Sequence, residues 1–122
     1  MSNRQLSPAV EVVSEPREPE HIKVLREAKA RINKPEKWCK GAYVSFRDPS
    51  AYCMLGSMGW RRSAVNDAPL SPGTDDASWL LKRVIGENIP DFNDAGITTH
   101  ADVMAAFDLA IEQATRDWLV AK

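Results

Sequence analysis

The residues of this chain that could carry out covalent chemistry are two cysteines and two histidines, Cys39, Cys53, His21 and His100. A thiol nucleophile needs a base within hydrogen-bond reach. His100 is far enough from Cys53 in sequence to return to it in a fold, and Asp94 or Asn93 could orient the imidazole. A small hydrolase or transferase that uses Cys53, His100 and Asp94 is therefore one prediction. It is the alternative prediction, because a cysteine on an apolar helix face usually behaves as a small buried hydrophobe.

Metal and nucleotide sites are not expected. A zinc site needs three or four ligands, and these cysteines and histidines include no close Cys-Cys or His-His pair. The six glycines are scattered and do not form a phosphate-binding loop of either common spacing. We therefore predict no metal and no cofactor.

Two other segments are better candidates for a binding site. Trp38 lies in a loop-like stretch that continues through Gly41 to Tyr43, which makes it the tryptophan most available to a partner. Asn93 and Asp94 lie in a turn before the last predicted helix. They either stabilise that turn through backbone hydrogen bonds or contact a ligand beside the helix entrance. The main function prediction is a non-enzymatic binding module that contacts a protein or a small ligand through Trp38, Gly41, Tyr43, Asn93 and Asp94.

Charge and hydropathy exclude several classes of protein. The formal net charge is −1, so we do not expect nucleic-acid binding, although Lys and Arg are concentrated between Lys23 and Lys40. We predict that this stretch is the solvated outer face of an amphipathic helix, with an anion-binding face as the alternative. No apolar run is long enough to span a membrane and the first 20 residues are polar, so we expect a cytoplasmic protein with reduced thiols.

The elements that must position these residues follow from apolar periodicity and helix-end signals. The chain of 122 residues is about one domain long. The fold class predicted is mainly α, with α+β as the alternative: a mobile arm over residues 1–17 and one helical globular domain over 18–122. The elements expected are helices over 19–32, 52–65, 74–86 and from about 99 to 118, an extended piece near 43–46, and a loop over 66–73. The tryptophans on the helical stripes, predicted to pack in the core, are Trp60, Trp79 and Trp118.

Three short motifs resemble those of a family of small uncharacterised bacterial and phage proteins. They are W-x-x-G-A at 38–42, C-x-L-G-A at 53–57 and W-N-D at 92–94, with Ser57 in place of the alanine and Phe92 in place of the tryptophan. The resemblance spans residues 20–115, and no motif position corresponds to His100. It implies a shared framework and the role of an accessory protein that acts on a host component, while it implies no particular activity.

Overall fold

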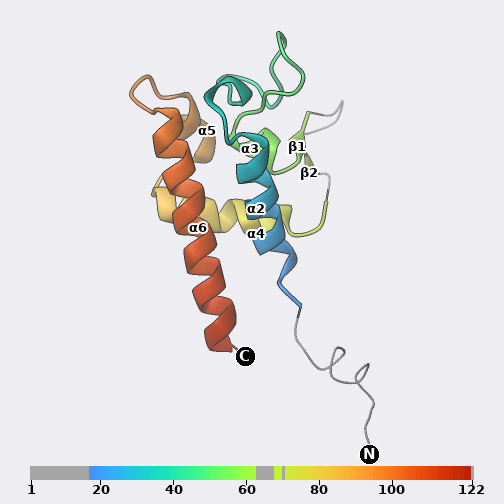
Figure 1. Ribbon diagram of the computed structural model, residues 1–122, viewed down its shortest axis with the longest axis vertical. Coiled ribbons are helices and arrows are strands. Elements are labelled where there is room, and N and C mark those ends of the chain that lie inside the picture. The colour runs from blue at the N-terminus through green and yellow to red at the C-terminus, as the bar shows by residue number, and fades with distance from the viewer. Residues whose placement is uncertain (1–16, 63–67, 70, 122) are drawn as a thin grey trace, which may run out of the picture.

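The computed structural model describes residues 17–62, 68, 69 and 71–121 (Figure 1). The predicted arm therefore lies outside the described residues, apart from Arg17. The described part contains five α-helices, a short 3-10 helix and a two-stranded hairpin, so the mainly helical fold class is confirmed. The elements are α2 (Glu20–Arg31), η1 (Pro35–Lys37), α3 (Met54–Ser57), β1 (Trp60–Arg61), β2 (Ala68–Pro69), α4 (Thr74–Ile85), α5 (Ile89–Asp94) and α6 (His100–Ala121).

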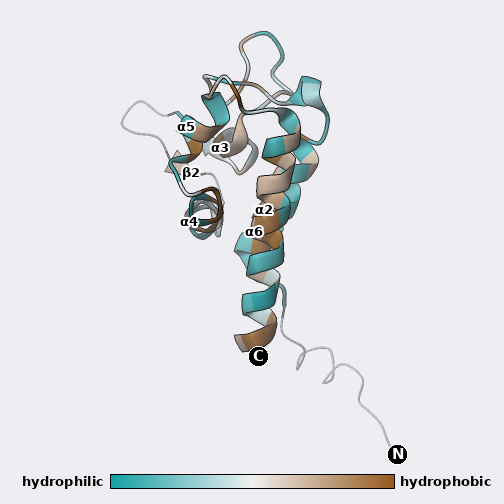
Figure 2. Ribbon diagram, turned by 90° about the vertical axis from the view of Figure 1, so that its left-hand side faces the viewer, coloured by the Kyte–Doolittle hydropathy of each residue, from teal (hydrophilic) through white to brown (hydrophobic). Residues whose placement is uncertain are grey.

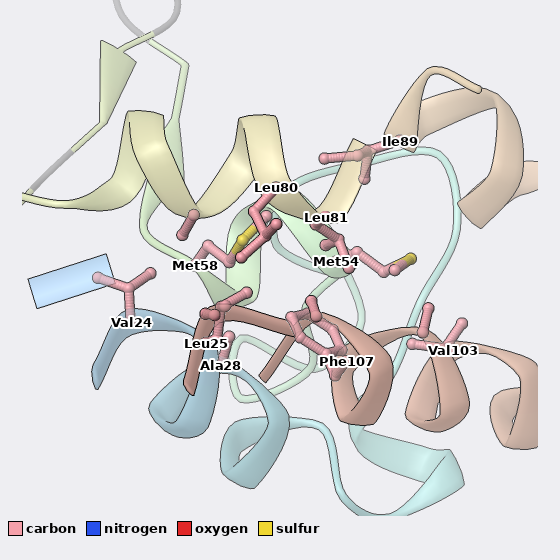
Figure 3. Packing of buried hydrophobic residues seen from close by; sticks show 14 of the residues in the cluster. Val24, Leu25, Ala28, Met54, Met58, Leu80, Leu81, Ile89, Val103 and Phe107 are labelled. Atoms are coloured by element: carbon pink, nitrogen blue, oxygen red, sulfur yellow. The ribbon is translucent and has the colours of Figure 1, made fainter. Parts of the chain in front are cut away.

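The three long helices form the core. Helices α2 and α6 run side by side, and α4 crosses them, so that in Figure 2 it is seen end-on with its apolar side toward the other two. Leu25 of α2, Leu81 of α4 and Phe107 of α6 are fully buried. Burial of each such side chain stabilises the fold by roughly 1.5–3 kcal/mol. In Figure 3 the side chains of Met54 and Met58 enter this core from α3 and the residue after it.

The ends of the long helices follow the local signals in the sequence. Helix α2 occupies Glu20–Arg31, within the predicted range. Gly86, with a φ of 85°, ends α4 in the left-handed conformation and donates its amide to the Lys82 carbonyl. At the start of α6 the Thr99 amide donates to Asp102 at 2.9 Å, and the Asp102 amide donates to the Thr99 hydroxyl at 3.2 Å. This reciprocal capping confirms the predicted start of the last helix.

The helix predicted over residues 52–65 is wrong. Helix α3 has a single turn, and Gly59, with a φ of 107°, redirects the chain into β1. Strand β1 pairs with β2 in an antiparallel hairpin, so the predicted loop over 66–73 contains a strand. A left-handed residue cannot continue an α-helix, which explains the early end.

The predicted core position of Trp79 is also wrong. Its side chain is 65% exposed, whereas Ala77, Leu80 and Leu81 of the same helix are buried. Successive helical residues are rotated by about 100°, so the buried stripe passes beside Trp79. Lys82 instead lies over the Trp79 ring, with its Nζ atom 5.3 Å from the ring centroid.

A looped segment, residues 38–45, encloses the extended residues 51–53. Tyr52 forms a parallel bridge with Trp38 on one side and an antiparallel bridge with Val44 on the other. The bridge at Val44 agrees with the extended piece predicted near 43–46. This arrangement brings residues 38–45 against α3. Among the described residues, no helix is long and apolar enough to cross a membrane.

Candidate functional site

The three sequence motifs meet at one place, which we call the motif junction: residues 38–42, 53–57 and 92–94. The bridges of Tyr52 place the first motif beside the second. Helix α5, which replaces the predicted turn, brings the third motif against α3. Figure 1 shows α5 and α3 as neighbours at the same end of the molecule. Segments far apart in sequence therefore meet at one place in the fold.

Asn93 is the centre of the motif junction. Its side chain is only 1% exposed. Its Oδ1 accepts hydrogen bonds from Trp38 Nε1 at 2.7 Å and from the Met54 amide at 3.0 Å. Its Nδ2 donates to the Cys39 carbonyl at 3.1 Å and to Asp94 Oδ1 at 2.8 Å. Through these bonds the Asn93 amide joins all three motifs. Loss of any one of them would leave a polar group without its partner, which is costly for a buried group.

Asp94 continues this network toward the surface. Its Oδ1 also accepts the amide of Gly41 at 2.9 Å. Gly41 has a φ of 83°, a conformation that side chains rarely adopt. Lys40 does not pair with the Asp94 carboxylate; its Nζ donates to the carbonyls of Ala95 at 2.6 Å and Thr98 at 3.2 Å. The carboxylate is thus oriented by backbone and amide donors.

A pocket of about 610 Å³ opens beside the motif junction. Residues of all three motifs line it: Gly41, Ala42, Cys53, Leu55, Asn93 and Asp94. The remaining lining residues come from the looped segment and the residue after it, from β1 and the residue after it, and from the start of α5: Tyr43, Val44, Phe46, Arg61, Arg62, Ile89 and Pro90. The lining is largely apolar, with one carboxylate and two arginines.

The structure brings four of the five predicted binding residues to this pocket. Gly41, Tyr43, Asn93 and Asp94 line it, whereas Trp38 is not among its lining residues and supports Asn93 instead. The sequence analysis did not predict the apolar lining of the pocket, which includes Leu55, Ile89 and Pro90. No local signal marks such residues, because they are indistinguishable in sequence from core residues.

The geometry around the thiols does not favour a nucleophile. Burial, and to a lesser extent the nearby Cys53 and Asp94, raises the pKa of Cys39 to about 11. Burial is also the main cause that raises the pKa of Cys53, although hydrogen bonds, including the one from the Gly56 amide to its sulfur, oppose this effect. A reactive cysteine needs the opposite shift, toward thiolate at neutral pH.

His100 has other partners. Its Nε2 lies 2.6 Å from the carbonyl oxygen of Ile32, to which it donates, and its ring lies 6.1 Å from that of Trp38. Within the described ranges no hydrogen bond joins His100 to Cys53 or Asp94. The same part of the chain contains no group of three or more His, Cys, Asp or Glu side chains placed to hold a metal ion.

Comparison with known proteins gives a family but no activity. Residues 16–113 match a family described as Family of unknown function (DUF6197). The chain belongs to this family. All three motifs of the junction lie inside the matched range of DUF6197. No curated protein and no solved structure matches the chain. The function of this DUF6197 protein must therefore be argued from its own geometry.

Proposed function

We propose that this DUF6197 protein is a non-enzymatic binding module that holds a small ligand, or a side chain of a protein partner, in the pocket beside the motif junction. The observation that carries the proposal is the lining itself. Six residues from three separate motifs face one cavity of about 610 Å³. A cavity of this size lies in the range of roughly 300–1,000 Å³ that is usual for small-molecule sites.

The composition of the pocket supports binding of a partly apolar molecule. Leu55, Ile89 and Pro90 offer apolar surface, and Asp94 adds a single fixed carboxylate. Ligand sites commonly combine a mainly apolar wall with a few polar groups that fix orientation. Asn93, Trp38 and the bridges of Tyr52 supply a rigid frame for these groups, which lowers the entropic cost of binding.

Binding without catalysis is favoured because the candidate catalytic groups are not activated. The pKa values of both thiols are raised, and the imidazole of His100 is engaged with a backbone carbonyl. The resemblance to bacterial and phage proteins extends the proposal to an accessory protein of the cytoplasm that acts on a host component.

The proposal is tested by filling the pocket. In Val44→Trp a large side chain would enter the cavity from the looped segment, whose backbone bridge to Tyr52 tolerates an aromatic residue. Ile97→Trp is the matched control, since Ile97 is 90% exposed and does not line the pocket. Each protein is purified from a bacterial lysate, and small molecules released on denaturation are identified by mass spectrometry.

A molecule released by the wild type and by Ile97→Trp, but not by folded Val44→Trp, is the expected result. The decisive second measurement is the melting temperature with and without added compound. If compounds that stabilise the wild type stabilise folded Val44→Trp equally, the pocket is not the binding site and the proposal is wrong.

A further inference from the structure

We infer that the ligand of this pocket carries a cationic nitrogen, a protonated amine or a guanidinium, attached to an apolar body, and that Asp94 receives the cation. The inference rests on the proposed function and names the chemical class of the ligand. Its basis is the way in which the structure divides the two oxygens of the Asp94 carboxylate.

One oxygen of Asp94 is used by the protein. Oδ1 accepts the Gly41 amide at 2.9 Å and the Nδ2 of Asn93 at 2.8 Å. Within residues 17–62, 68, 69 and 71–121, no hydrogen bond reaches Oδ2. Because Asn93 is buried and Gly41 belongs to the looped segment, the carboxylate is held in place before any ligand arrives. An oriented carboxylate with an oxygen to spare is an acceptor for a charge-assisted hydrogen bond.

Two cations near the motif junction, Lys40 and Arg61, are directed elsewhere. Lys40 donates to the carbonyls of Ala95 and Thr98, and its Nζ lies 5.3 Å from the Trp38 ring centroid. Arg61 donates from one guanidinium nitrogen to the carbonyls of Gly56 at 2.8 Å and Trp60 at 2.7 Å, and it lies over the Tyr52 ring. In the described part of the chain no ion pair involves Asp94. Arg62 lines the same pocket and has no side-chain partner within the described residues, but it forms no ion pair with Asp94. The exposed carboxylate of Asp94 is therefore open to a cation from outside.

The apolar wall determines what accompanies the cation. Leu55, Ile89 and Pro90 line the same cavity as Asp94. A strongly hydrated inorganic cation would gain nothing from these residues, whereas an organic cation buries its carbon skeleton against them. The remaining positive groups of the lining, Arg61 and Arg62, disfavour a ligand with several cationic centres. The chemistry that fits is one cationic nitrogen on a compact apolar skeleton.

A matched pair of probes tests this class. The probes are 4-phenylbutylamine, which is protonated at neutral pH, and 4-phenylbutan-1-ol, which has the same skeleton without the charge. Binding is followed by two-dimensional NMR of the ¹⁵N-labelled full chain. The Gly41 amide is the reporter, because it donates directly to the Asp94 carboxylate.

In the wild type the amine is expected to bind at least about tenfold more tightly than the alcohol and to shift the Gly41 resonance. In Asp94→Asn this difference is expected to disappear, while the alcohol binds as before, because the amide oxygen of asparagine can still accept the Gly41 amide. Asp91→Asn is the charge-matched control: Asp91 is exposed on α5 and does not line this pocket, so the preference for the amine should persist.

Two results would overturn the inference in distinguishable ways. Equal affinities of the two probes in the wild type, both lost in Val44→Trp, would leave the pocket as a binding site and refute the cationic ligand. If neither probe moves a pocket resonance, the inference and the proposed pocket both fail. The comparison of amine with alcohol uses the wild type, so it stands even if Asp94→Asn does not fold.

Discussion

Gly56 of α3 lies directly against the backbone carbonyl of Tyr43, where a Cβ atom at position 56 would be 1.9 Å from the carbonyl oxygen and 2.6 Å from the carbonyl carbon. The looped segment and α3 can approach this closely only because residue 56 has no side chain. The obstructing atoms are backbone atoms, tied down by the hydrogen bond between the Cys53 amide and the same carbonyl. We therefore predict that Gly56→Ala lowers the free energy of unfolding by about 1–3 kcal/mol, the usual cost of overpacking.

The measurement is chemical denaturation of the wild type, Gly56→Ala and the control Gly96→Ala. A Cβ at Gly96 meets nothing within 4 Å, so this control should change the free energy of unfolding by less than about 0.5 kcal/mol. Equal stability of all three proteins would mean that the looped segment does not pack on α3 in this way.

Loss of the Asn93 side chain should lower the free energy of unfolding substantially. Asn93→Ala leaves the Trp38 indole N–H, the Met54 amide and the Cys39 carbonyl without their partner. The bond from the Met54 amide is buried, and the other two are partly buried. An unpaired buried group costs about 1–3 kcal/mol and a partly buried one less, so we expect a total loss of at least about 2 kcal/mol. Asn88→Ala is the control in these denaturation experiments, because Asn88 is exposed and, within the described residues, its side chain makes a single long contact of 3.5 Å with Asp91.

A double-mutant cycle separates the Trp38 contact from the rest. If the 2.7 Å bond matters, Trp38→Phe and Asn93→Ala together should destabilise by less than the sum of the single changes, with a coupling energy of roughly 0.5–3 kcal/mol. Strict additivity would show that Trp38 contributes to stability independently of Asn93.

The sequence is a good guide where structure depends on neighbouring residues. The reciprocal capping of Thr99 and Asp102, the end of α4 at Gly86 and the stripe of α2 all follow from contacts within a few positions. The one-turn helix α3 does not, because its end depends on the left-handed conformation of Gly59 and on pairing with a distant strand. A periodic apolar pattern over 52–65 carries no information on that pairing.

In the candidate site, too, the sequence indicates local features but not the contacts between distant residues. The residue types at Asn93 and Asp94 suggest a turn or a polar contact, and local reasoning cannot choose between them. What decides the role of Asn93 is its bond to Trp38, 55 positions away, and no spacing rule reaches that far. The apolar lining of the pocket also cannot be predicted from the sequence. Leu55 and Ile89 have the same residue types as core residues, and only the structure shows the cavity beside them.

The thiols provide a test of the cysteine-dependent alternative. With a pKa of about 11, only about one Cys39 thiol in a thousand is ionised at pH 8. The pKa of Cys53 is raised as well, and its side chain is buried. We predict that iodoacetamide modifies both thiols slowly at pH 8 in the native protein and much faster after denaturation. Rapid alkylation of native Cys53, seen by peptide mass spectrometry, would restore the nucleophile hypothesis.

The raised pKa of Cys39 also affects the stability of the protein at high pH. A folded-state pKa raised from 9.0 to about 11 means that the neutral thiol of Cys39 is favoured by folding. Its contribution to stability is complete below pH 9 and is lost as the pH rises toward 11. In Cys39→Ala this part of the pH dependence should be absent, so the stability of the wild type should fall more steeply than that of the variant between pH 9 and 11. Parallel curves of denaturation midpoint against pH would contradict the raised pKa.

Two tryptophans test the boundary of the core. Trp60 is partly buried against the core and donates its Nε1 to the Ser78 hydroxyl at 2.8 Å, whereas Trp79, one residue further along α4 from Ser78, is 65% exposed. Trp60→Ala should therefore lower the free energy of unfolding by about 2 kcal/mol or more, through lost packing and the lost bond to the Ser78 hydroxyl, which keeps its own bond to the Thr74 carbonyl. Trp79→Ala removes mainly an exposed contact with Lys82 and should lower the free energy of unfolding by less than about 1 kcal/mol.

Both variants are compared with the wild type by urea denaturation. Equal losses of stability would place Trp79 in the core, as the sequence pattern predicts, and would require α4 to be rotated so that this side chain faces the core.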